Sequence, residues 1–148
     1  MLKEEYIFLE LDVSTKDEVL TFISHQAQKM NITDDEEKLY ADLIARESEF
    51  PTGLQDGFAI PHARTENVKE IAIMYITTKQ GLEWGTLDEK LVHNMFVLLV
   101  PSHHEGNVHL QMISKLATCL LEEDFKEKVK SCTNKAELKE YILKEMEV

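Results

Sequence analysis

The residues best suited to chemistry in this chain are a histidine and an arginine on either side of a short stretch rich in proline and glycine. His62 directly follows Pro61, and Arg46 precedes the stretch. A neutral imidazole is nucleophilic and titrates near physiological pH, so it can accept a phosphoryl group and release it again. A guanidinium is a permanent cation with paired N–H donors. Together they favour the chemistry of a small anion held beside an imidazole.

The backbone that positions His62 is defined by proline and glycine. Pro61 fixes its own φ and restricts the residue before it to extended geometry. Residues 58–60 are therefore predicted to form a short strand that stops at Pro61 and presents His62 at its end. Gly53 and Gly57 permit backbone conformations closed to other residues and let a ligand approach the main chain.

Arg46 is expected in the last turn of a helix. Thr33 and Glu36 have the form of a capping box, with a hydroxyl at the N-cap and a carboxylate three residues later. The buried stripe of this helix consists of Leu39, Tyr40, Leu43 and Ile44. From the last turn the guanidinium can reach towards the 52–62 loop. Arg46 also suits a solvated position in the charged run that follows, so spacing alone leaves both interpretations open.

A second histidine, His109, follows a good N-cap residue, Asn107. A helix that begins near Asn107 places His109 in its first turn. Free N–H groups and the positive end of the helix dipole stabilise a phosphate there. From spacing alone, a solvent-facing histidine is the simpler interpretation.

A metal site is the alternative for this region, because His103, His104 and Glu105 lie close to His109 in the sequence. Zinc requires three or four converging ligands, yet the adjacent histidines point their rings apart and no cysteine is near. We expect no metal. The chain also lacks a Walker A loop and a Gly-x-Gly-x-x-Gly turn, so no nucleotide cofactor is expected. Phosphate would have to arrive from a phosphorylated protein.

Two apolar segments predict the centre of the fold. Residues 71–77 and 95–100 are apolar on both alternating faces, which is typical of strands covered on both sides. The polar stretch 79–90 between them predicts a long turn or hairpin at the rim. Residues 6–13 alternate and predict an opening strand or extended arm. We predict one α/β domain over 1–148, with a small mixed sheet of about five strands flanked by helices on both faces.

The remaining helices are predicted from their caps. Thr15 and Glu18 form a capping box at the start of the first helix. Residues 124–129 predict a short helix, and Asn134 with Glu137 caps the last one.

Composition excludes some classes of function. With 28 acidic and 16 basic residues, the net charge is -12, the opposite of what a nucleic-acid-binding protein needs. No apolar run reaches membrane-spanning length and the N-terminus has no signal-peptide core, so we expect a cytoplasmic protein that does not insert into a membrane. Cys119 and Cys132 have no paired spacing and are interpreted as reduced thiols, with Cys119 buried.

Several short motifs occur in the order known from one protein family. They are Arg46-Glu47, Thr52-Gly53, Gly57, Ala59-Ile60-Pro61-His62, Pro101 and His109-Leu110. This series spans nearly the whole chain and resembles the active-site signature of bacterial phosphotransferase-system (PTS) IIA components of the mannitol/fructose type. Such spaced matches are more specific than a lone motif. The fold that the resemblance implies is the mannitol/fructose-type IIA fold.

The resemblance also implies a role for each site residue. His62 would accept a phosphoryl group on Nε2 from the histidine-containing carrier HPr and pass it to a cysteine of a IIB component. His109 would help to hold the transferred group without being phosphorylated, and Arg46 would contact its oxygens. Thr52 and Gly53 would add a hydroxyl and backbone N–H groups. The membrane component IIC would be reached only indirectly.

Three functions remain open from the sequence. The first is a phosphotransferase component of sugar uptake, and the second is a regulatory module, since the same IIA fold serves in nitrogen-type systems and in transcription activators. The third is a metal-binding or purely structural domain with an inert His62. Residues 43–53 look most like galactitol-type IIA proteins, whereas His109 fits the mannitol/fructose type better, so the sugar is open too.

Overall fold

The computed structural model describes residues 1–103 and 107–147. In this part of the chain the strands are β1 (Ile7–Leu11), β2 (Phe58–Ala59), β3 (His62–Thr65), β4 (Ala72–Leu82) and β5 (Val92–Pro101). The helices are α1 (Lys16–Lys29), α2 (Glu36–Glu49), α3 (Val108–Cys119), α4 (Glu123–Ser131) and α5 (Lys135–Met146), and a 3₁₀ turn, η1 (Glu4–Tyr6), precedes β1. The strands form one five-stranded mixed sheet, which confirms the predicted fold class.

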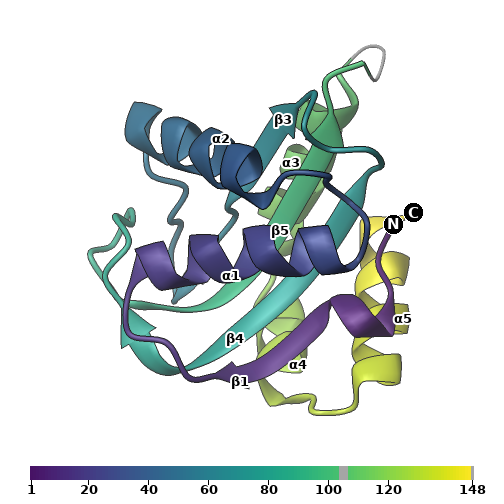
Figure 1. Ribbon diagram of the computed structural model, residues 1–148. Helices are drawn as coiled ribbons and strands as arrows, with labels where there is room; N and C mark the ends of the chain where they lie inside the picture. Colours follow the sequence, from purple (N-terminus) through teal and green to yellow (C-terminus); the bar gives the residue numbers. More distant parts are fainter. Residues whose placement is uncertain (104–106, 148) are drawn as a thin grey trace.

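The helices cover both faces of the sheet. In Figure 1, α1 and α2 lie over one face, and α3, α4 and α5 lie over the other. β4 and β5 lie at the centre, as predicted, and pair antiparallel with each other. β1 pairs in parallel with β4, and β2 and β3 both pair in parallel with β5. The core lies on both sides of these central strands, where the rings of Tyr75 and Phe96 have centroids 4.8 Å apart.

The turn between the central strands is shorter than the sequence predicted. β4 continues through the polar stretch to Leu82, which is buried and pairs with Val92. Gly81 lies inside the strand because Leu91 and His93 pack closely over it, and an added Cβ would be 2.7 Å from the side chain of Leu91. This glycine therefore marks a close contact inside the hairpin and not the turn itself.

A short strand does stop before Pro61, as predicted, but the prediction that His62 lies at the end of that strand is wrong, because His62 opens a new strand. β2 ends at Ala59 and β3 begins at His62, and both strands pair with β5. Pro61 has no N–H to donate, which interrupts the ladder. Its carbonyl still accepts from the backbone N–H of Leu98 at 3.0 Å, so the chain stays in register with β5.

The predicted caps of α1 and α5 are confirmed. Thr15 accepts from the backbone N–H of Glu18 at 3.1 Å, and Asn134 accepts from that of Glu137 at 2.9 Å.

The cap of α2 differs from the prediction, since Asp35 and not Thr33 is its N-cap. The backbone N–H groups of Ile32 and Thr33 bond to the carbonyl of Ala27, which holds Thr33 at the end of α1. Asp35 instead accepts from the backbone N–H groups of Glu37 and Lys38, each at 3.1 Å.

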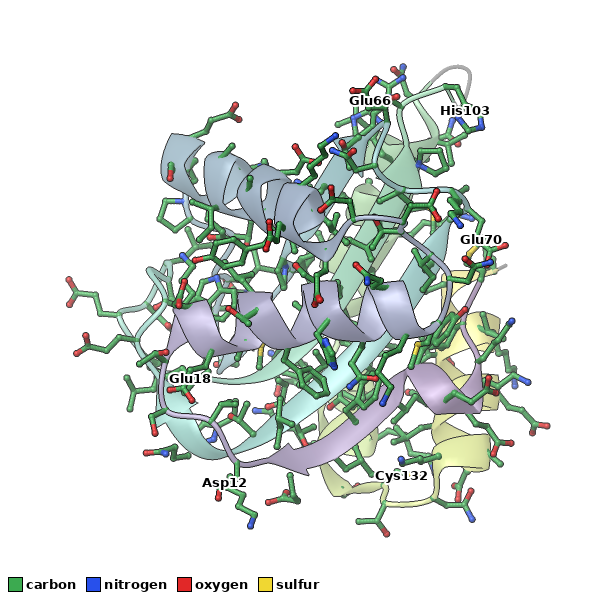
Figure 2. The ribbon with its side chains drawn as sticks, in the orientation of Figure 1. Asp12, Glu18, Glu66, Glu70, His103 and Cys132 are labelled. Atoms are coloured by element: carbon green, nitrogen blue, oxygen red, sulfur yellow. The ribbon has the colours of Figure 1, made fainter. Side chains whose placement is uncertain are left out.

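The surface carries most of the acidic residues. Glu18, Glu66 and Glu70 project outward from different parts of the fold (Figure 2). Cys119 and Cys132 are unpaired and half-buried, so the prediction of a buried Cys119 is wrong. No helix of the described residues is long and apolar enough to cross a membrane.

Candidate active site

A cavity of about 540 Å³ opens between α2, β3 and α3. Its charged and titratable lining residues are Asp42, Arg46, Glu49, His62, Arg64 and His109. The fold thus brings together the three residues that the sequence singled out first. They come from the last turn of α2, the start of β3 and the first turn of α3.

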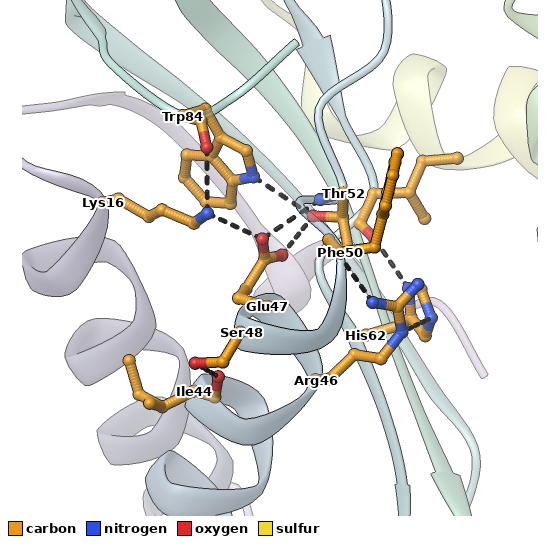
Figure 3. Close-up of polar contacts among 10 residues, drawn as sticks. Lys16, Ile44, Arg46, Glu47, Ser48, Phe50, Thr52, His62 and Trp84 are labelled. Atoms are coloured by element: carbon orange, nitrogen blue, oxygen red, sulfur yellow. Dashed lines mark hydrogen bonds and ion pairs between the residues drawn. The ribbon is translucent and has the colours of Figure 1, made fainter.

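The two ring nitrogens of His62 have different partners. Nδ1 lies 2.8 Å from the carbonyl oxygen of Ile60, and Nε2 accepts a hydrogen bond of 3.0 Å from Nε of Arg46 (Figure 3). A carbonyl can only accept and a guanidinium N–H can only donate, so the proton is assigned to Nδ1 and the lone pair to Nε2. Both contacts therefore require the same neutral tautomer, with Nε2 as the nucleophilic atom.

The surroundings of His62 favour this neutral form. Burial is the main cause that lowers the pKa of His62, and the Arg46 cation and His109 lower it further. The Ile60 carbonyl and the Glu47 carboxylate act in the opposite direction, yet the pKa stays below its ordinary value. Desolvation disfavours the imidazolium ion because the charged form loses more hydration than the neutral one.

Arg46 is held in place from a second side. Its Nη1 donates to the carbonyl of Phe50 at 2.8 Å, where the chain leaves α2 (Figure 3). The Arg46 guanidinium therefore bridges the C-terminal end of α2 and the imidazole of His62 on β3. The predicted position of Arg46 in the last turn of α2 is confirmed.

A buried ionic network lies beside this pair. Glu47 accepts from the backbone N–H of Thr52 at 3.1 Å and from its hydroxyl, and lies 2.7 Å from Nζ of Lys16. Nε1 of Trp84 donates to the Thr52 hydroxyl at 3.1 Å, and Lys16 donates to the Trp84 carbonyl at 3.0 Å. Figure 3 shows these contacts joining α1, α2 and two loops. No sequence pattern pointed to the partners Lys16 and Trp84, because they are distant in the chain.

The structure does not bring Thr52 and Gly53 into the cavity. The Thr52 hydroxyl is engaged by Glu47 and Trp84, and neither Thr52 nor Gly53 is among the residues that line the cavity. Gly53 packs against the backbone of Gly85, where an added Cβ would lie 2.1 Å from the carbonyl oxygen. Both residues instead fix the loop that carries the Phe50 carbonyl.

His109 lies in the first turn of α3, whose N-cap is Asn107, as predicted. Its Nδ1 is buried and has no hydrogen-bond partner among the residues that the structure describes. Burial lowers the pKa of His109, and the Arg64 cation lowers it further. An orphaned buried N–H is rarer than an orphaned acceptor, so we assign the lone pair to Nδ1 and the proton to Nε2. His109 is then a hydrogen-bond donor, with the tautomer opposite to that of His62.

The sequence analysis did not single out Asp42, Glu49 or Arg64, of which Arg64 is the cation. It stands two positions after His62 on the same strand, and alternation along a strand puts both residues on one face. The spacing of two residues from His62 was the sequence signal that could have identified Arg64.

No group of three or more His, Cys, Asp and Glu side chains in residues 1–103 and 107–147 is arranged to hold a metal ion. The candidate zinc ligands His104 and Glu105 lie outside the described residues.

Known proteins resemble this chain in both sequence and fold. The family model described as "Phosphoenolpyruvate-dependent sugar phosphotransferase system, EIIA 2" matches residues 1–145. The "PTS system fructose-specific EIIA component" of Haloferax volcanii is 30% identical over 143 residues, which cover 97% of this chain and 92% of that protein. The "PTS system fructose-specific EIIABC component" of Bacillus subtilis is 28% identical over 129 residues, which are 87% of this chain and 20% of that protein. The chain thus spans most of the first relative and about a fifth of the second.

Two solved structures share the fold. The nitrogen regulatory protein IIA-Ntr of Neisseria meningitidis superposes with a TM-score of 0.86 at 28% identity, with 93% of each chain covered. The complex of enzyme IIA-Mtl and phosphorylated enzyme IIB-Mtl from Escherichia coli matches with a TM-score of 0.76 at 21% identity, with 99% of each chain covered. Because the family match covers residues 1–145, this chain belongs to the EIIA type 2 family of the phosphoenolpyruvate-dependent sugar phosphotransferase system, whose members are phosphotransferase components.

Proposed function

We propose that this protein is a phosphocarrier of sugar uptake that accepts a phosphoryl group from phospho-HPr on His62 and passes it to a cysteine of a IIB component. The observation that carries the proposal is the pair of contacts on His62. The Ile60 carbonyl oxygen accepts from Nδ1 and so keeps the proton there. The cationic guanidinium of Arg46 donates to the unprotonated Nε2. An unprotonated nitrogen beside a guanidinium is suited to attack phosphorus.

The transfer can be written with all bonds accounted for. The Nε2 lone pair of His62 attacks phosphorus, and the bond from phosphorus to the donor imidazole breaks, leaving its electron pair on the donor nitrogen. Nδ1 keeps its proton, so the phosphorylated ring carries a formal positive charge that the Ile60 carbonyl stabilises. A IIB thiolate then attacks phosphorus, and the electron pair of the broken P–N bond returns to Nε2.

The other cavity residues would stabilise the group in transit. The Arg46 Nε–H gives up its bond to Nε2 when phosphorus approaches, and the guanidinium then donates to the phosphoryl oxygens. His109 donates from Nε2 to the same group. Thr52 and Gly53 act indirectly, by fixing the loop whose Phe50 carbonyl orients Arg46. No metal or nucleotide takes part in this scheme.

The partners and the sugar belong to the same proposal. The E. coli complex described above pairs an enzyme IIA with a phosphorylated enzyme IIB, and this supports a IIB acceptor here. The two relatives described above are fructose-specific by name, whereas residues 43–53 resemble galactitol-type proteins. The cytoplasmic location and the indirect link to IIC remain parts of the proposal.

The test is phosphorylation with phosphoenolpyruvate, enzyme I and HPr. We expect one phosphoryl group per chain, labile to acid and stable to base, as an N-linked phosphate should be. His62→Ala should abolish the label, and His93→Ala, which removes an exposed histidine outside the cavity, should not. Labelling of His62→Ala at the wild-type level would disprove the acceptor assignment.

A regulatory function is the second candidate, because the IIA-Ntr structure resembles this chain at 28% identity. In that case His62 would still be phosphorylated, but its phosphorylation state would control a binding partner. Transfer from the phosphorylated protein to the IIB encoded nearest to its gene distinguishes the two. Rapid transfer supports sugar uptake, and a stable phosphoprotein that changes its binding partners supports regulation.

A further inference from the structure

Arg64 lies on the same side of β3 as His62. Along this strand Ala63 and Thr65 are buried, whereas His62 and Arg64 are more exposed; all four residues contribute to the cavity lining. Residues two positions apart on a strand are separated by about 7 Å, which a long arginine side chain can span. A group bound to the imidazole of His62 is therefore within reach of the Arg64 guanidinium.

The guanidinium of Arg64 is anchored at the rim of the cavity. Its Nη2 donates to the carbonyl of Ser102 at 3.1 Å, and the backbone N–H of Ser102 donates to the carbonyl of Thr65 at 3.1 Å. These bonds tie β3 to the segment that leads towards α3 and His109. A guanidinium has five N–H donors, so its bond to Ser102 is compatible with donation to a further acceptor. Burial is the main cause that lowers the pKa of His109, and the Arg64 cation in the same cavity lowers it further.

The net charge of the residues that line the cavity depends on Arg64. Arg46 and Arg64 are balanced by Asp42 and Glu49, while burial lowers the pKa of both His62 and His109 and so favours their neutral forms. The Asp42 carboxylate is already bonded by Thr65 at 2.6 Å and Asn67 at 2.7 Å. A phosphoryl group adds between one and a half and about two negative charges at neutral pH. With Arg46 alone, the cavity would hold an excess of negative charge before that group arrived.

We propose that Arg64 is a second arginine of the phosphoryl site, which binds the phosphoryl group on His62 from β3 while Arg46 binds it from α2. This inference rests on the proposed function. Two guanidinium groups on different elements can donate to different phosphoryl oxygens and neutralise the dianion. Arg64 would therefore stabilise the phosphorylated state itself, and not only the encounter with another protein.

The test measures the phosphoryl group without a partner protein. The full chain is phosphorylated with phosphoramidate, a small phosphoryl donor, and the ³¹P NMR signal is titrated with pH. A cation close to the group lowers the pKa of its last ionisation, so Arg64→Gln should raise that pKa by about one unit. Arg64→Lys keeps the charge without the paired donors and should give a smaller rise. Lys144→Gln removes the same charge from an exposed site on α5 and should change nothing.

The outcomes separate this inference from the function on which it rests. If Arg64→Gln leaves the phosphoryl pKa at the wild-type value and only weakens transfer between proteins in a salt-dependent way, Arg64 is a docking residue and the inference is overturned. If the wild-type protein gains no phosphoryl group on His62 from phosphoramidate or from phospho-HPr, the proposed function itself fails. As a control for folding, thermal unfolding of Arg64→Gln should occur at the wild-type temperature, because the Arg64 side chain is exposed.

Discussion

The Nε–H of Arg46 donates to Nε2 of His62 over 3.0 Å, so the cation of the site lies at the very atom that would attack phosphorus. In the free protein this bond holds the imidazole in one tautomer and keeps the guanidinium close. During transfer the bond must break, because the lone pair that accepts it becomes the bond to phosphorus. The same arginine would thus prepare the nucleophile and then bind the group it receives.

The first prediction concerns pH. The pKa of His62 is lowered, chiefly by burial, so the imidazole should stay neutral as pH falls through about 6.5, where a free histidine becomes protonated. The rate of phosphorylation should therefore stay constant as pH falls through about 6.5 and should decrease only at lower pH. NMR titration of the ring should show the same low pKa, and Arg46→Gln should raise it because a cation that disfavours the imidazolium is lost. A wild-type His62 that titrates with an ordinary or raised pKa would contradict a nucleophile kept neutral by burial.

The second prediction concerns His109. If it donates a hydrogen bond to the phosphoryl group, His109→Ala should still become phosphorylated on His62 but should pass the group on more slowly. Removal of a preorganised donor costs on the order of a hundredfold in rate. Single-turnover transfer from the preloaded protein to IIB measures this, with His25→Ala as the control because His25 is exposed on α1. A wild-type rate in His109→Ala would place His109 outside the site.

The third prediction concerns the ion pair between the buried Glu47 and the partly exposed Lys16. Lys16→Met should lower the free energy of unfolding by about 3 kcal/mol, because the buried Glu47 carboxylate loses its partner. The double variant with Glu47→Gln should be more stable than Lys16→Met alone, since no unpaired charge is left. Urea unfolding of the two single variants and the double variant gives the coupling energy. Additive effects would mean that the pair is not coupled.

The fourth prediction compares two glycines. Gly53→Ala should destabilise the protein by about 3 kcal/mol, because the new methyl group would overlap the Gly85 carbonyl and force two loops apart. Gly57 has a φ of +86° but more space around it, so Gly57→Ala should cost only the backbone strain, about 1 kcal/mol. Thermal unfolding ranks the two variants, and a larger loss in Gly57→Ala would contradict the loop packing described above.

The sequence by itself determined the features that depend on local chemistry. The caps at Thr15 and Asn134 could be predicted because a side chain that accepts from a backbone N–H three residues later needs no tertiary contact. The two central strands could be predicted because burial on both faces leaves a continuous apolar run. The pairing of His62 with Arg46 was expected from the reach of a guanidinium at a helix end and from the family resemblance.

Tertiary structure alone decided the features that depend on distant partners. His62 opens β3 because hydrogen bonds to β5 resume after Pro61, and nothing local specifies that partner. Thr52 faces Glu47 and Trp84 and not the cavity, because a buried carboxylate must be satisfied by whichever donors the fold brings to it. Arg64 joins the cavity for a similar reason: its strand, the loop at Ser102 and α3 meet only when the sheet is assembled.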